Sequence, residues 1–502
     1  MKKNIVLYTL FCTLTGLLFS CSPAGHIPYS PQKKYTPQEL KEDLDVMEET
    51  LRRNHPSLHW YATEAEVDKA FERARQVIAD SMNEVSFRIL LNETAGVLRC
   101  GHTSVRNSRM YSWFMAGSRS SGFPLGLKIT DDSTLVITSS LYRNDSVLRR
   151  GMKVTSINNR NAKQLIDTLL PLVPIDGFSK NFSYQNISNN FGRFYNSRFP
   201  SDSSYIIQYY DYENRLKTTT LHWYDPKKDT AGRRIRVAAS TAIPSKRQLK
   251  LQSVRSFAVD SSGQWAVLRL NTFTHELKRS WLRKKFRELR RKKIDQLVVD
   301  VRNNGGGLIQ SSLLLTRLLK KAPFTYSDSI TAVTRSVRSK ARISKRFLTN
   351  LGMTFLSKKI NDSLYRFRYF QKKEYQPHRL GFKGNVYLLT GGYSFSATTM
   401  FLSNVKGEPG ITLVGEETGG GWYGNNGVFI PDIILPNTKL RVRLPLYHIV
   451  NKRTLPSNGS GVWPDVEVRP TAETIRMNTD PKMEKAIELI QEKNRGVQRK
   501  PS

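Results

Sequence analysis

The sequence contains very few cysteines for its length. Cys12, Cys21 and Cys100 are the only three among 502 residues, which excludes a disulfide scaffold and a zinc site built of cysteines alone. Acidic side chains are also scarce, because 42 Asp and Glu stand against 79 Lys and Arg, and the formal net charge is therefore +37. With 31 Gly, 22 Pro and 39% hydrophobic residues, the chain is neither collagen-like nor wholly disordered. Its length allows several domains of roughly 100–200 residues each.

The amino terminus has the features of a secretory signal. Lys2 and Lys3 precede a mostly apolar run at 5–19, which is shorter than the roughly 20 residues that a membrane-spanning helix needs. The run ends in Leu18-Phe19-Ser20-Cys21, which resembles a bacterial lipobox and makes Cys21 the predicted lipidation site. A plain signal peptide that happens to end near a cysteine is the alternative. We therefore expect a lipoprotein of the bacterial cell envelope, anchored to a membrane and facing the periplasm.

Two segments concentrate the positive charge. Residues 278–293 and 335–383 are rich in Lys and Arg and hold few acids. Apolar residues at helical spacing in the first segment predict an amphipathic helix with a solvated basic face. Such surfaces favour anionic lipid headgroups or cell-wall polymers as partners. Nucleic acid is disfavoured because a secreted protein rarely meets it. Whether 324–384 forms a lid or a basic docking surface stays open.

Local signals divide the chain into units. Thr36 with Glu39, and Thr63 with Glu66, have the spacing of capping boxes that open helices. We expect, in order, the following segments: signal peptide 1–20, tether 21–34, helical unit 35–110, strand-rich domain 120–225, linker 226–256, α/β domain 257–475, and a carboxy-terminal helix with a basic tail 476–502.

The third unit carries the strongest chemical signals. Continuous apolar strands at 297–301, 386–390 and 411–414 alternate with helical segments, which predicts a largely parallel sheet covered by helices. Active sites in such sheets gather where strands end and helices begin. Two turns lie at such places, the glycine-rich turn 304–307 and the turn 391–397. Ser396 in the second turn is either a nucleophile or a simple helix N-cap, and its spacing alone favours the N-cap.

Four motifs in this region occur in the order and spacing of one known family. They are Asp300-Val301-Arg302-Asn303-Asn304-Gly305-Gly306-Gly307, Ser394-Phe395-Ser396-Ala397, Val414-Gly415-Glu416-Glu417-Thr418-Gly419-Gly420 and Gly461-Val462-Trp463-Pro464-Asp465. The chain thus resembles the S41 serine peptidases, which include the carboxy-terminal processing proteases and the tricorn-like peptidases. The resemblance implies a mixed α+β fold class: the helical unit, a PDZ-like middle domain at 120–225, and an α/β S41 (ClpP/crotonase-like) catalytic domain.

The resemblance also implies roles for individual residues. Ser396 would attack the peptide carbonyl, and backbone N–H groups of Gly306 and Ala397 would hold the oxyanion. His102, in a Gly-His-Thr turn after the helical unit, would be the base, as in tricorn-like members. No metal or other cofactor is implied.

The sequence departs from the family pattern at the base and at the acid. The processing-protease branch has a lysine base where this chain has Gly421, and no lysine follows until Lys439. Tricorn-like members have their acid near the position where this chain has Asn458. The third catalytic residue is therefore unassigned, with Glu416, Glu417 and Asp465 as candidates. A thiol nucleophile at Cys100 is a further, disfavoured idea, because residues two apart rarely aim at one carbonyl.

These features lead to one main hypothesis and two alternatives. We expect a serine endopeptidase of the S41 class that hydrolyses unfolded or processed envelope polypeptides, since PDZ-like domains bind extended chains by strand addition. A catalytically degenerate S41-fold protein that binds peptides or envelope polymers is the first alternative. A protein whose basic patches bind envelope polymer or lipid is the second, and its binding would weaken steeply with salt.

Overall fold

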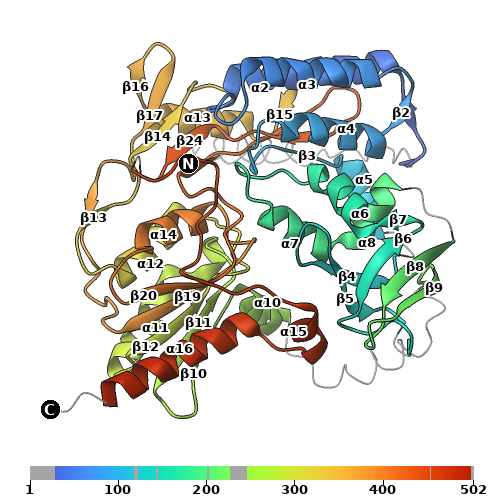
Figure 1. Cartoon of the computed structure of the whole chain (residues 1–502). Coiled ribbons are helices and arrows are strands. Elements are labelled where there is room, and N and C mark those ends of the chain that lie inside the picture. The colour runs from blue at the N-terminus through green and yellow to red at the C-terminus, as the bar shows by residue number, and fades with distance from the viewer. Residues whose placement is uncertain are drawn as a thin grey trace, which may run out of the picture.

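The computed structural model describes residues 29–117, 122–142, 145–199, 203–225, 246–452 and 454–498 (Figure 1). The predicted signal peptide, the lipidation site Cys21 and most of the tether lie outside these residues. Within the described ranges, no helix is long and apolar enough to cross a membrane.

Three helices follow the amino-terminal strand and lie at the top of Figure 1. They are α2 (Pro37–Asn54), α3 (Glu64–Val77) and α4 (Glu84–Gly96), and β1 (Lys34–Tyr35) pairs with β2 (Met82–Asn83) beside them. Both predicted capping boxes are confirmed, because Thr36 and Thr63 each accept a hydrogen bond from the N–H of the glutamate three residues later. These helices have no core of their own, since their apolar faces share one cluster with side chains from 313–449.

The middle of the chain forms an antiparallel sheet with helices against it. Its order is β4-β5-β6-β8-β9, and β7 pairs with β6. The strands are β4 (Leu125–Ile129), β5 (Leu135–Ser140), β6 (Lys153–Ile157), β7 (Arg160–Asn161), β8 (Ser204–Tyr210) and β9 (Leu216–His222). The helices are α6 (Ala162–Leu169), η1 (Leu170–Leu172), α7 (Asn181–Asn189) and α8 (Phe191–Arg198). The predicted strands and hairpin thus form, while the likeness of this domain to PDZ domains stays a prediction.

A six-stranded sheet organises the carboxy-terminal half. Its order is β10-β11-β12-β19-β20-β25, and all neighbours are parallel except the edge pair β10–β11. The strands are β10 (Arg255–Val259), β11 (Trp265–Leu270), β12 (Gln296–Asp300), β19 (Asn385–Thr390), β20 (Ile411–Gly415) and β25 (Val466–Glu467). Part of the predicted linker is therefore structured: α10 (Lys246–Val254) leads into β10, which the sheet pairs as an edge strand.

Helices cover both faces of this sheet, as the continuous apolar strands predict. On one face pack α11 (Arg279–Arg291), α12 (Ile309–Leu319) and α14 (Ala397–Val405). On the other face packs α16 (Pro481–Gln498), which α15 (Ala472–Met477) precedes in the chain. A short helix, η3 (His275–Leu277), follows β11, and its Leu277 packs in the cluster of the first face. The buried side of α11 carries Leu282, Phe286 and Leu289. The basic residues of that segment occupy the solvent side of an amphipathic helix, as the spacing predicted.

Strands from the segment between β12 and β19, together with strands that follow β20 and with β3 (Ser104–Arg106), form two smaller sheets beside the helical layer. One has the order β16-β17-β14-β24-β21 and the other β15-β22-β23-β3, while β13 pairs with β18. The elements are β13 (Phe324–Thr325), β14 (Ser329–Ala332), β15 (Arg342–Ile343), α13 (Arg346–Leu356), β16 (Ser357–Asn361), β17 (Leu364–Phe367), β18 (Glu374–Tyr375), β21 (Gly424–Gly427), β22 (Asp432–Ile434), β23 (Arg441–Arg443) and β24 (Tyr447–Val450).

The strand β3 (Ser104–Arg106) joins the amino-terminal part of the chain to the carboxy-terminal half. It pairs antiparallel with β23, with Ser104 opposite Arg443 and Arg106 opposite Arg441, and α5 (Arg109–Gly117) follows it. Because β3 begins two residues after His102, this pairing fixes the histidine turn to the carboxy-terminal half.

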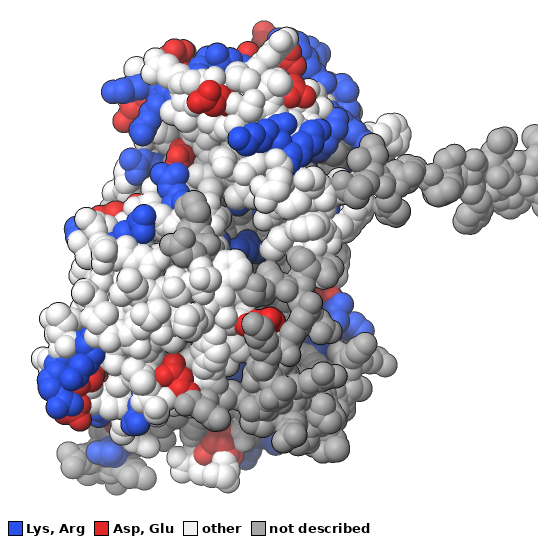
Figure 2. All heavy atoms as spheres, turned by 90° about the vertical axis from the view of Figure 1, so that its right-hand side faces the viewer, with Lys and Arg blue, Asp and Glu red and all other residues white. Residues whose placement is uncertain are grey.

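The charge on the face shown in Figure 2 is mixed. Lys and Arg gather over the upper part of this face, where they are interspersed with Asp and Glu. Ion pairs such as Arg52–Glu48 and Arg75–Asp45 join α2 to itself and to α3. Exposed pairs of this kind contribute about 0–1 kcal/mol each to stability. We therefore interpret the charged side chains of this part of the face as an ordinary solvent-exposed surface.

Candidate active site

Ser396 lies on a strained turn between a buried strand and a helix. β19 ends at Thr390, and α14 begins at Ala397. The backbone of Ser396 has φ +57° and ψ −123°, a conformation that costs a non-glycine residue about 1–3 kcal/mol. Its side chain makes no capping hydrogen bond, so the simple N-cap interpretation of this serine does not hold. A strained strand-to-helix turn instead projects a serine hydroxyl toward solvent or substrate.

Ser394, in the same turn, has a different environment. Its side chain is fully buried, and its hydroxyl donates to the Val301 carbonyl oxygen at 2.9 Å. This bond ties the turn after β19 to the turn after β12. Ser394 therefore supports the loop and is not available for chemistry.

The glycine-rich turn after β12 contacts Ser396 directly. Gly306 has φ +94°, and a Cβ at this position would come within 2.8 Å of both the Phe395 carbonyl oxygen and the Ser396 Cβ. Glycine is therefore required by conformation and by contact. The Gly306 N–H donates to the Asn304 side-chain oxygen at 2.9 Å, and this bond would have to break before that N–H could hold an oxyanion. The N–H of Ala397 opens α14 and has no intrahelical acceptor.

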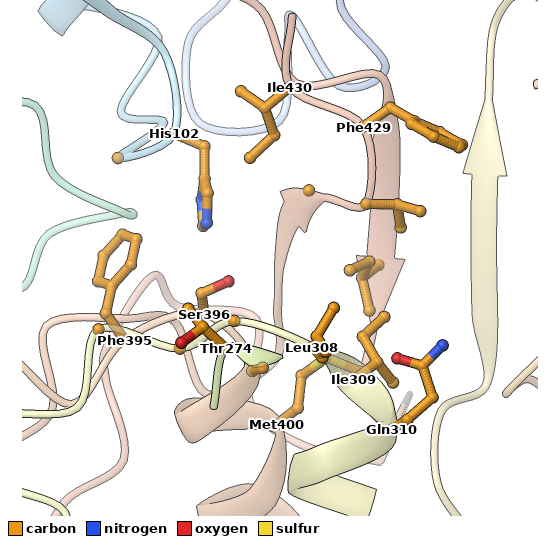
Figure 3. Close-up of a pocket in the computed structure, with 18 of the residues that line it drawn as sticks. His102, Thr274, Leu308, Ile309, Gln310, Phe395, Ser396, Met400, Phe429 and Ile430 are labelled. Atoms are coloured by element: carbon orange, nitrogen blue, oxygen red, sulfur yellow. The ribbon is translucent and has the colours of Figure 1, made fainter. Parts of the chain in front are cut away.

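His102 faces Ser396 from the opposite side of a cavity. Figure 3 shows a ring nitrogen of His102 directed toward the Ser396 hydroxyl. The ring is buried and packs against Phe395, with 4.9 Å between ring centroids. The two predicted residues are therefore brought together from distant parts of the chain. No hydrogen bond joins these two described side chains, which is common where substrate is absent.

Asp176 stands behind His102 and is a residue that the sequence did not single out. Its carboxylate oxygen Oδ2 lies 3.9 Å from His102 Nδ1, and both atoms are buried without a hydrogen-bond partner among the described residues. The other oxygen, Oδ1, accepts the Gly101 N–H at 2.6 Å. A buried carboxylate with a free oxygen aimed at a histidine nitrogen is suited to hold that ring and to stabilise its charged form.

A cavity of about 680 Å³ opens between these groups. The His102 turn, the glycine-rich turn and the start of α14 line one end of it. Apolar side chains line much of the rest, namely Leu308, Ile309, Leu356, Phe367, Phe370, Met400, Val428, Phe429, Ile430 and Ile449. Arg443 adds a cation to the wall, and burial lowers its pKa to about 10, so that it stays charged at neutral pH. The site can therefore accept an apolar side chain beside Ser396.

The carboxy-terminal half of the chain matches a known family. Residues 264–468 match the model of peptidase family S41. The chain carries an S41 peptidase domain. The fold is similar to that of mature CPAF, both complexed with lactacystin (14% identity, TM-score 0.60, 90% of this chain and 97% of that chain) and in a second structure (14%, 0.60, 90% and 96%). A photosystem II D1 C-terminal processing protease aligns over 87% of this chain and 94% of its own, with 14% identity and a TM-score of 0.40. No curated protein sequence matches the chain significantly.

The three acids that the sequence nominated in this S41 domain have other partners. Glu416 pairs with the buried Lys482 ammonium, and Glu417 accepts the Gly461 N–H at 2.7 Å. Burial is the main reason that the pKa of Glu417 is raised. Asp465 accepts from Lys406 Nζ and from the Leu413 N–H, both at 2.8 Å. These carboxylates join loops and strand ends of the S41 domain, whereas the carboxylate beside His102 belongs to Asp176.

No lysine occupies the family's lysine position in this S41 domain. Gly421 lies there, and a Cβ would come within 2.5 Å of the Gly424 carbonyl oxygen. Lys439 donates to the Pro436 carbonyl oxygen on an exposed loop, and the Asn458 side chain accepts from Ser460. A lysine base therefore has no counterpart at either position, and the titratable side chain that faces Ser396 across the cavity is His102.

The Cys100 side chain is not suited to act as a nucleophile next to the S41 site. The Cys100 thiol is buried and accepts from the Asn426 side-chain nitrogen at 3.2 Å. Burial raises its pKa to about 11, so it is a neutral thiol rather than a thiolate nucleophile at neutral pH. In the part of the chain that the structure describes, no three His, Cys, Asp or Glu side chains could hold a metal ion.

Proposed function

We propose that this protein is a serine endopeptidase in which Ser396 is the nucleophile, His102 the general base and Asp176 the residue that positions the histidine. One observation carries the proposal: a buried carboxylate oxygen lies 3.9 Å from a buried histidine nitrogen, and neither atom has a hydrogen-bond partner among the described residues. Unpaired buried polar groups of this kind cost stability, so a structure retains them mainly where they serve function. The strained serine across the cavity supplies the group on which such a pair acts.

The geometry supports the following reaction. His102 takes the proton from the Ser396 hydroxyl as its oxygen attacks the peptide carbonyl carbon, and it later gives that proton to the leaving amine. Asp176 stabilises the ring while it is positively charged. The N–H of Ala397 faces the developing oxyanion, and the N–H of Gly306 joins it once released from Asn304. One donor of this kind contributes about 3–4 kcal/mol to the rate. Water then hydrolyses the acyl-enzyme by the same proton path.

The cavity and the predicted topology suggest the substrates. Its apolar wall favours polypeptides with a large apolar side chain next to the scissile bond, and such side chains are accessible in unfolded chains. We propose envelope polypeptides as the substrate class, since Cys21 is the predicted site of a lipid anchor that faces the periplasm. The family itself supports a polypeptide substrate.

A fluorophosphonate serine probe tests the nucleophile and its base without knowledge of the substrate. We expect covalent labelling of the wild-type protein, none in Ser396→Ala, and a strong loss in His102→Ala. Ser394→Ala is the matched control, because that serine is two residues away but bonded to Val301. It should keep labelling.

Two results would contradict the proposal. One is labelling that survives in Ser396→Ala, and the other is a folded wild-type protein that never labels. The second would favour a degenerate S41 fold that binds peptides or polymer without cleaving them.

A further inference from the structure

The solvent-facing side of α13 is apolar. Phe347, Leu348, Leu351 and Phe355 have exposed fractions of 76%, 61%, 42% and 68%. At about 100° per residue, these four positions share one face of the helix. Helices on protein surfaces normally turn polar side chains outward, and a contiguous exposed apolar patch marks a surface that something else covers. Ile360, 52% exposed, extends the apolar side chains onto the neighbouring hairpin of β16 and β17.

The opposite face holds the helix firmly in place. Thr349 and Met353 are buried, and Gly352 lies against the Phe429 ring, where a Cβ would come within 2.9 Å. The exposed face is thus a fixed feature of the fold, and turning the helix would expose the core. Leu356, at the end of α13, lines the cavity beside Ser396, so the apolar face and the candidate active site belong to one region.

Cations flank both ends of this helix. Lys345 and Arg346 lie at its amino terminus, and Lys358 and Lys359 follow its carboxy terminus, all exposed. Among the described residues, Lys345, Arg346 and Lys358 have no acidic partner. Residues 335–383 contain just two acids, Asp362 and Glu374. The amino terminus of a helix carries a partial positive charge, and the side-chain cations there add to it. An external anion would therefore be stabilised at this end of α13.

We propose that α13 lies in the headgroup region of a bilayer rich in anionic lipid, with its apolar face in the acyl boundary. The helix of about 16 Å would lie parallel to the membrane. Its aromatic and leucine side chains would enter the apolar layer, and the cations at its ends would contact lipid phosphates. The inference does not depend on the proposed catalysis, although it would place the cavity close to the membrane surface.

A fluorescent probe on α13 tests this contact in the full chain. Cys12→Ser and Cys21→Ser leave Cys100, which is buried and resists labelling. An environment-sensitive dye is then attached at Leu351→Cys or, as control, at Glu473→Cys on α15, which lies on the opposite side of the molecule in Figure 1. With phosphatidylglycerol vesicles we expect a blue shift at position 351 and none at 473. Phosphatidylcholine vesicles should bind at least tenfold more weakly, because each cation contributes about fivefold.

Variants separate the contribution of the apolar side chains to vesicle binding from the contribution of the cations. Phe347→Ser with Phe355→Ser should weaken vesicle binding at least tenfold, while Phe347→Leu with Phe355→Leu should retain it. Lys358→Gln should reduce binding and its salt dependence. Since these side chains are exposed, the variants should keep the thermal stability of the wild type. Ser396→Ala should bind vesicles unchanged, which separates this inference from the proposed function.

Three outcomes would overturn the proposal. The first is no blue shift at position 351 with anionic vesicles. The second is a blue shift without vesicles that grows with protein concentration, which would assign the face to a second copy of the chain. The third is a shift produced by an extended apolar peptide but not by vesicles, which would assign it to substrate.

Discussion

Replacing Asp176 by asparagine tests the candidate active site at the residue that only the structure revealed. Asparagine keeps the shape and still accepts the Gly101 N–H, but it removes the negative charge that faces His102. Two unit charges 3.9 Å apart interact by about 4 kcal/mol at an effective dielectric constant of about 20. Because the histidine gains a positive charge as it takes the serine proton, this energy is lost from the transition state. We expect labelling by the serine probe to slow about a thousandfold.

The second-order rate of fluorophosphonate labelling measures this effect directly. Asp465→Asn is the matched control, since that carboxylate binds Lys406 and Leu413, and it should stay within about threefold of the wild type. A positioning residue acts through its partner, so Asp176→Asn should add little in a His102→Ala background. The reasoning is refuted if Asp176→Asn costs less than tenfold, or if it costs equally with and without His102.

Three further predictions concern the surroundings of the site. Gly306→Ala should lower the labelling rate at least a hundredfold, because its Cβ would displace Ser396. Gly305→Ala should change the rate little, since among the described residues, its chain neighbours aside, no atom lies within 4 Å of a Cβ there. Equal losses in the two variants would contradict this reasoning. Cys100→Ala should keep labelling within about tenfold, and the thiol should react with maleimide only after unfolding; fast reaction in the folded state would show that it is not buried. Burial lowers the pKa of His55 from 6.5 to about 3 and that of His448 from 6.5 to about 4. Below pH 6.5 the unfolded chain therefore binds more protons at these histidines than the folded protein does. The free energy of unfolding in urea should therefore fall from pH 6.5 to 4, by up to about 1.4 kcal/mol per pH unit for each histidine, and less steeply in His448→Gln; an unchanged slope in that variant would contradict the assignment.

The features that sequence predicted well are those set by neighbours along the chain. Thr36 and Glu39 form their capping box because the two residues are one helical turn apart, and tertiary structure is not needed to bring them together. Apolar runs at 297–301 and 386–390 predicted buried parallel strands, because a strand covered on both faces needs apolar side chains throughout. Within the predicted linker, 246–256 forms α10 and the start of β10, and from Arg255 on the pairing with β11 overrides a polar, basic composition that does not indicate a strand.

The local motifs placed a serine turn and a glycine-rich turn after strands of one predicted parallel sheet, and they nominated His102 by its Gly-His-Thr turn. The tertiary fold makes these two strands neighbours and brings the side chains at their ends together. The β3–β23 pairing carries His102 to the carboxy-terminal half, and a loop of the middle domain brings Asp176 beside it. Sequence motifs record residues that are close along the chain, whereas a proton relay depends on distances of a few ångströms between segments far apart. A lone aspartate in a loop carries no local signal, and we propose its role from the burial of its carboxylate beside a histidine nitrogen that has no hydrogen-bond partner among the described residues.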